Sequence, residues 1–251
     1  QETDATPVPY PVTIATTVGQ TEVMGTIIRR VTFINSYVAM DLNTINGVIV
    51  EDVSGCPLAL GMRLRTITDH SSIRGIKWHV SIWDTLNDQT LDAVGAAATN
   101  IKTWRARNFI DFMVHRVDGT NFSQIVAFEG NRGIYFSDFQ NDAGLGWSQW
   151  TNINIDGHAI PLEVDAIGDL EISNSNFSAT NTTVDPDTLM WSALLGDGTA
   201  TGRILISNSL FASRGQGIVI NAPDFVGLNN ISSRTGAAMT NPIQNADHVT
   251  I

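Results

Sequence analysis

The chain has 251 residues, 43% of them hydrophobic and 16% charged, and its 14 Lys and Arg against 25 Asp and Glu give a net charge of −11. This length and apolar content support one sizeable core without requiring a second domain. Nucleic acids and anionic membranes attract dense basic patches, so the charge argues against both as partners. The single Cys56 excludes an internal disulfide framework.

After about 20 irregular residues rich in Thr, Pro and Val, short runs of alternating apolar residues return along the chain, each ended by Asn, Asp, Ser or Gly. The clearest runs are 47–53, 151–157, 169–177 and 203–211. Alternation with a period of two indicates strands, and these corner residues suit tight turns. Strands too short to bury a face alone, repeated about every 20 residues, indicate a solenoid.

The pattern predicts strands throughout the chain and no helix, because no segment longer than ten residues carries a helical apolar stripe. The expected strands are 38–42, 47–53, 60–67, 72–78, 109–118, 124–128, 133–139, 150–155, 160–165, 170–177, 190–195, 204–211, 217–221 and 225–231. We therefore predict an all-β parallel solenoid that forms a single domain over 1–251. Residues 248–251 resemble the start of another strand, so we expect a chain truncated at one or both ends.

Two stretches interrupt the repeat, 79–103 and 140–149, and both contain tryptophan. Long loops in a compact repeat often carry function. Aromatic rings stack on the apolar faces of sugars, so Trp83 and Trp147 are candidate substrate-binding residues. Both loops are expected to emerge beside the functional face.

The corners at 172–177 (Ile-Ser-Asn-Ser-Asn-Phe) and 206–211 (Ile-Ser-Asn-Ser-Leu-Phe), with Gly-Ile-Val-Ile following at 217–220, are similar to coils of a known superfamily. They resemble the right-handed parallel β-helices of the pectate-lyase-like (pectin lyase-like) superfamily, and the resemblance extends over 25–231. It implies a secreted or virion-borne protein that faces a polysaccharide. The superfamily includes lyases, glycoside hydrolases, phage tailspikes and adhesins, so the resemblance specifies the fold more closely than the chemistry.

In this superfamily the strand that opens each coil lines the substrate groove. Alternation then predicts which side chains of that strand point outward. The expected outward column is Asp41, Arg63, Arg65, Asp111, His115, Tyr135, Glu163 and Asp165. It is a strip of mixed charge in the middle of the rod.

Within this column, Asp111 and Glu163 lie two coils apart, which corresponds to a backbone separation of about 9–10 Å at the strand spacing. That is close to the ~6.5–9.5 Å between the carboxyl groups of an inverting glycosidase. The sequence therefore predicts a glycoside hydrolase in which Asp111 is one catalytic partner and Glu163 or Asp165 the other. His115 and Arg63 would orient the substrate or stabilise charge, and Arg65 and Tyr135 are further substrate-binding candidates.

Two alternatives remain open. The first is a polysaccharide lyase, with Arg63, Arg65 or Arg116 as base or charge neutraliser and Asp111, Asp138 and Asp165 around a calcium ion; the hydrolase needs no cofactor. The second is a non-catalytic β-helix that binds glycans or acts as a spacer, in which the column only keeps the surface soluble. A tailspike-like protein would be a trimer.

Overall fold

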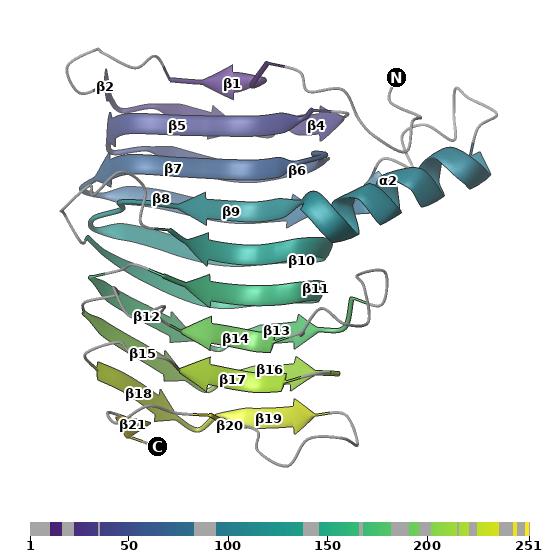
Figure 1. The fold of residues 1–251 in the computed structure, drawn as a ribbon. Coiled ribbons are helices and arrows are strands. Elements are labelled where there is room, and N and C mark those ends of the chain that lie inside the picture. The colour runs from purple at the N-terminus through teal and green to yellow at the C-terminus, as the bar shows by residue number, and fades with distance from the viewer. Residues whose placement is uncertain are drawn as a thin grey trace.

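The structure is a computed structural model that describes residues 11–16, 23–34, 36–82, 94–137, 146–165, 168–181, 191–195, 202–214, 216–220, 225–235, 243–244 and 249–250. The strands in these segments form one connected sheet, and every strand pair is parallel. The strands stack from β1 at one end to β21 at the other, and α2 projects to one side (Figure 1). The chain is all-β apart from this helix, as predicted.

Parallel pairing divides the strands into three series. The first series contains β1 (Ile14–Ala15), β5 (Val38–Asn46), β7 (Leu60–Thr68), β9 (Ile110–Val114), the ends of β10 (Thr120–Phe136) and β11 (Trp147–Val164), β14 (Trp191–Leu195), β17 (Gln216–Ile220) and β20 (Ile243–Gln244). β2 (Val23–Met24) pairs with the end of β5.

The second and third series contain the remaining strands. The second contains β3 (Ile27–Arg29), the starts of β6 (Ile49–Cys56), β8 (Ser71–Trp78), β10 and β11, then β12 (Asp169–Ser173), β15 (Arg203–Ser207), β18 (Phe225–Asn229) and β21 (Val249–Thr250). The third contains β4 (Thr32–Ile34), the ends of β6 and β8, the middles of β10 and β11, then β13 (Asn176–Ala179), β16 (Leu210–Ser213) and β19 (Ser232–Thr235).

The chain passes through the three series in a fixed order, first, second, third and first again. On many neighbouring strands the partners lie 22 or 23 residues apart, and the hydroxyls of Thr151 and Ser173 are an example at 22. Side chains far apart in sequence therefore form rows across the sheet. These rows determine which residues share a surface.

Apolar rows fill the interior. In the first series the row Met40, Met62, Phe112, Ile134 and Leu162 is fully buried. In the second, Trp150 stacks on Phe122 with ring centroids 3.7 Å apart, and Phe112 and Phe136 meet its indole edge-on. Aromatic contacts of this kind add to the free energy gained by apolar burial.

Asparagines turn the corner between the second and third series. Asn152, Asn174, Asn208 and Asn230 have φ values of 55°, 51°, 47° and 52°. This left-handed region is costly for most residues and less so for Asn, which explains the Asn-rich corners of the sequence. Their amides also bond along the stack, since Nδ2 of Asn230 donates to Oδ1 of Asn208 at 2.7 Å.

The prediction that the chain contains no helix is wrong, because α2 (Val94–Asn108) occupies most of the described part of the first insertion. Its side chain Ile101 packs with Cys56, Leu58 and Val80 in a small apolar cluster outside the main core. No helix among the described residues is long and apolar enough to cross a membrane.

Candidate functional site

The outward face of the first series carries a row of polar side chains in register. Across neighbouring strands the row runs through Asp41, Arg63, Met113, Tyr135 and Glu163. Two residues further along the strands lie Arg65, His115, Ser137 and Asp165, as the backbone hydrogen bonds show. We refer to the following residues as the polar strip: Asp41, Arg63, Arg65, His115, Arg132, Tyr135, Ser137, Glu163 and Asp165.

At one end of the polar strip two arginines hold one carboxylate. Nη2 of Arg65 lies 3.0 and 2.9 Å from the two carboxylate oxygens of Asp41, and Nη1 of Arg63 lies 3.3 Å from Oδ2. Asp41 is largely buried beneath the arginines, while both guanidinium groups remain partly exposed. Hydrogen bonds between charged groups are stronger than neutral ones, so this cluster presents a fixed, partly neutralised positive surface.

In the middle of the polar strip, His115 Nδ1 lies 2.7 Å from the hydroxyl of Ser137. Partial burial lowers the pKa of His115, and the positive charges of Arg63 and Arg65 lower it further. The imidazole is therefore neutral at pH 7, with one nitrogen available to accept a proton.

At the other end, Tyr135 donates a hydrogen bond of 2.8 Å to Oδ2 of Asp165. Burial raises the pKa of the Tyr135 hydroxyl, and the bond to Asp165 raises it further, so this group stays a donor at neutral pH. Arg132 forms an ion pair with the largely buried Glu163, and its guanidinium lies 4.8 Å from the ring centre of Tyr135. Two carboxylates two residues apart thus lie at the end of β11.

The expected outward position of Asp111 is wrong, because its side chain is fully buried. Its row across the sheet contains Gly61 and Gly133 rather than the charged residues of the polar strip. Asp111 lies at the start of β9, where the chain leaves a corner, and Oδ2 lies 2.5 Å from Nε2 of the fully buried His158. Side chains alternate between the two faces within a regular strand, but this alternation does not extend to the start of β9, next to the corner. The pairing of Asp111 with Glu163 therefore finds no support in the geometry.

Only parts of the two insertions lie within the described residues, 79–82 and 94–103 of the first and 146–149 of the second. Helix α2 ends at the corner before β9, where the guanidinium of Arg105 lies 3.6 Å from the ring centre of Phe109. Residues 147–149 belong to the second-series part of β11, so Trp147 lies on a different series from the polar strip. Trp83 lies outside the described residues. Trp147 is 44% exposed.

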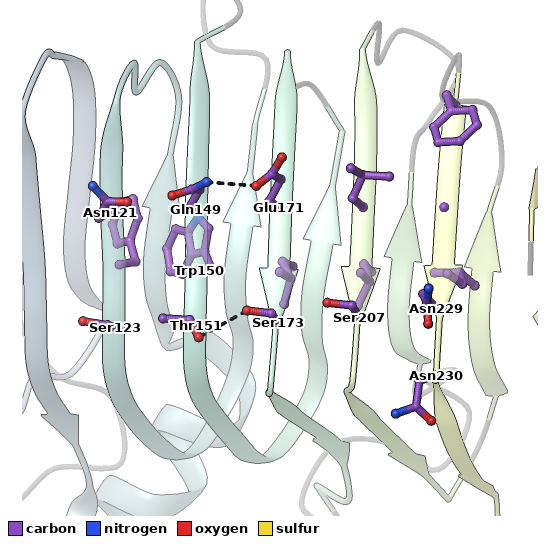
Figure 2. A pocket seen from close by; sticks show the side chains of 17 residues that line it. Asn121, Ser123, Gln149, Trp150, Thr151, Glu171, Ser173, Ser207, Asn229 and Asn230 are labelled. Atoms are coloured by element: carbon purple, nitrogen blue, oxygen red, sulfur yellow. Dashed lines mark hydrogen bonds between the residues drawn. The ribbon is translucent and has the colours of Figure 1, made fainter.

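A hollow of about 1080 Å³ lies on the second series, where the sequence indicated no site (Figure 2). Residues of β10, β11, β12, β15 and β18 line it. The signal available in the sequence was the recurring Ser or Thr before each corner Asn, which we interpreted only as turn chemistry. The sequence alone does not give the register between neighbouring strands, and without that register the hollow cannot be predicted.

Comparison with protein-family models, with curated protein sequences and with solved structures finds no match to this chain. Within the described residues, no three His, Cys, Asp or Glu side chains converge closely enough to hold a metal ion.

Proposed function

We propose that the chain is a right-handed parallel β-helix of the pectate-lyase-like kind and that it is an extracellular enzyme that hydrolyses a polysaccharide. Three series of parallel strands visited in a fixed order, with many partners 22 or 23 residues apart, support the fold. The resemblance of the Asn-rich corners supports the substrate class. The polar strip supports the reaction.

The observation that carries the reaction is the carboxylate pair at the end of β11. Glu163 lies near the end of β11 and Asp165 directly follows that strand, so their backbones lie about 6–7 Å apart. Side chains can open this to the ~6.5–9.5 Å that leaves room for a water in an inverting glycosidase. Such an enzyme needs one carboxyl that protonates the leaving oxygen and one that activates water.

The environment of each carboxyl suggests its role. The hydrogen bond from Tyr135 stabilises charge on Asp165, which suits the base that activates water. Glu163 is the acid in this proposal, and Arg132, its present ion-pair partner, would turn to a substrate hydroxyl during binding. Arg63 and Arg65 would position the next sugar units beyond His115. A neutral polysaccharide fits best, because Asp41 already occupies both arginines.

A lyase is the second candidate, and one observation favours it. The neutral His115 beside Ser137 has the protonation state of a general base. In a lyase it would remove the proton next to a uronate carboxylate, while Arg63 and Arg65 stabilise the resulting charge. A lyase of this kind requires an acidic polysaccharide as substrate, and its product carries an unsaturated sugar.

The non-catalytic β-helix is the third candidate. Every carboxylate of the polar strip has a hydrogen-bond or ion-pair partner within the protein. Such an arrangement also suits a surface whose charges serve solubility and folding. In that case the protein binds or displays glycans without cleaving them.

A reducing-sugar screen over plant, algal and bacterial polysaccharides tests the proposal. We expect activity on at least one neutral polymer, and Glu163→Gln and Asp165→Asn should each lower kcat by about 10²–10⁴-fold. Glu129→Gln is the matched control, because this carboxylate lies outside the polar strip, pairs with Lys102 and should be dispensable.

The outcomes separate the three candidates. Full activity in both carboxylate variants would exclude Glu163 and Asp165 as the catalytic residues. Products that absorb in the ultraviolet, with activity lost in His115→Gln, would favour the lyase. A protein inactive on the whole panel would be a non-catalytic β-helix.

A further inference from the structure

The hollow on the second series has the size and lining of a binding groove. Its volume of about 1080 Å³ slightly exceeds the ~300–1,000 Å³ of typical small-molecule pockets. It extends across five neighbouring strands, from β10 to β18, so its long axis runs along the stack (Figure 2). A ligand that fills it must be elongated.

The floor of the groove repeats with the strands. Figure 2 shows a row of hydroxyls, one on each of four successive strands, from Ser123, Thr151, Ser173 and Ser207. Asn229 continues the row on β18. Neighbouring strands lie about 4.8 Å apart, so polar groups recur along the groove at an interval close to the length of one pyranose ring.

Phe225 lines the groove, and a second exposed aromatic side chain, Trp147, lies outside the lining in the same row of the sheet. Trp147 is 44% exposed and Phe225 is 39% exposed. They occupy the same row, because Trp147 pairs with Asp169, Asp169 with Arg203, and Arg203 with Phe225. Three strand spacings, about 14 Å, separate them along the axis. Aromatic rings at this spacing could stack on two sugars of the same chain.

The charges beside the groove compensate one another. Arg203 lies 3.4 Å from Asp169 and 3.7 Å from Glu171, and Gln149 donates a 2.9 Å hydrogen bond to Glu171. Neither a free cation nor a dense acidic patch therefore lines the described part of the groove. An uncharged ligand suits this surface better than an anionic or a cationic one.

We infer that this groove binds a neutral, extended polysaccharide, with Trp147 and Phe225 stacking on sugar rings and the hydroxyl row bonding to sugar hydroxyls. A protein partner fits less well, because protein interfaces are depleted in Ser and Glu and this floor carries Ser123, Ser173, Ser207 and Glu171. The groove lies on the second series and the polar strip on the first, so the inference does not depend on the proposed cleavage. The site would retain the protein on its substrate or target surface.

Isothermal titration calorimetry with cellohexaose, mannohexaose, laminarihexaose and hexagalacturonate tests this site. We expect at least one neutral hexasaccharide to bind more tightly than the anionic one. Trp147→Ala and Phe225→Ala should each weaken that binding by about tenfold, because each variant removes an aromatic face that stacks on a sugar ring. Both side chains are exposed, so both variants should keep the circular dichroism of the parent.

Ile27→Ala is the matched control, because Ile27 is a 57% exposed apolar residue of the second series outside the groove. It should leave the affinity unchanged. The inference is overturned if none of the neutral hexasaccharides binds, if hexagalacturonate binds more tightly, or if Ile27→Ala weakens binding as much as Trp147→Ala. A dimer in sedimentation velocity that Phe225→Ala dissociates would also overturn it, since a second copy would then cover the groove.

The combined variant Glu163→Gln, Asp165→Asn separates this site from the proposed enzyme. We expect it to keep the hexasaccharide affinity of the parent. An affinity that falls tenfold or more would place sugar binding on the polar strip and contradict the groove.

Discussion

Inside the protein, Asp111 and His158 form a fully buried pair. Nδ1 of His158 lies 3.0 Å from the carbonyl oxygen of Asp156, which can only accept, so Nδ1 carries a hydrogen. Nε2 faces Oδ2 of Asp111 at 2.5 Å. Both side chains are fully buried, and burial raises the pKa of Asp111 while His158 opposes the rise.

Removal of His158 should therefore destabilise the protein in a pH-dependent way. His158→Ala leaves a buried carboxylate without its partner, which typically costs about 3–5 kcal/mol. With its pKa raised, Asp111 keeps its proton in the folded state at pH values where the unfolded chain releases it, so the stability of this variant should fall as pH rises from 4 to 7. Urea unfolding at each pH measures the effect.

The double variant Asp111→Asn, His158→Ala is the control for that experiment. It lacks the buried acid, so its unfolding free energy should exceed that of His158→Ala by an amount that grows with pH. A difference that stays constant between pH 4 and 7 would show that Asp111 does not titrate as its burial requires.

The titration of His115 is a second test on the scale of one residue. Its pKa should lie below the ordinary value of 6.5, because burial and the neighbouring arginines disfavour the charged ring. Folding then favours the neutral imidazole, and that contribution to stability is lost as pH falls through the unfolded value. A pH titration followed by nuclear magnetic resonance of the imidazole protons measures this pKa. A value at or above 6.5 would contradict the burial of His115 beside Arg63 and Arg65.

Individual side chains also show how far alternation along a strand can be trusted. Met113, Tyr135 and Glu163 share one row as alternation requires. Asp111 does not share this row. At a corner the direction of a side chain depends on the neighbours that cover it, and here the neighbour is His158. Those neighbours come from another coil, and the sequence near Asp111 carries no trace of them.

Among the elements, α2 is the one that the sequence did not reveal. Its first turns contain the run Ala96, Ala97 and Ala98, which favours a helix by intrinsic propensity without producing an apolar stripe. The helix is held by a few specific contacts at its end. Arg105 donates to the carbonyl oxygen of Pro57, and Nδ2 of Asn181 donates to those of Ala106 and Gly130 at 2.8 and 3.0 Å.

Asn181→Ala should loosen this attachment. The variant leaves two buried carbonyl groups without that donor, which costs about 1–3 kcal/mol. Hydrogen exchange should accelerate in residues 101–108, and the unfolding free energy should fall by the same amount. Asn131→Ala is the matched control, because its amide bonds to the carbonyl oxygen of Arg107 at an exposed position and should change stability by only about 0.5 kcal/mol. Equal losses in both variants would mean that Asn181 contributes no more than a surface bond.

On the scale of the whole molecule, the parallel register between the strands determines both surfaces. The alternating runs and Asn-rich corners contain the information for parallel strands, because each strand needs a buried row and each corner a residue that accepts positive φ. The polar strip follows from that pattern once the series are aligned. The groove does not follow from that pattern, because it depends on Ser, Thr and aromatic residues that give no signal within any single strand.

The register between coils is therefore the claim on which the polar strip and the groove both depend, and engineered cysteines test it directly. Thr151 and Ser173 are paired neighbours whose hydroxyls lie 3.2 Å apart, and their Cα atoms should lie about 4.8 Å apart, within the ~4.4–6.8 Å range of disulfides. We predict that Thr151→Cys with Ser173→Cys forms an internal disulfide on mild oxidation, detected by mass spectrometry of the peptides. Thr151→Cys with Asp165→Cys, closer in sequence but on different series, should remain reduced. The opposite result, a bond in the second pair and none in the first, would contradict this register.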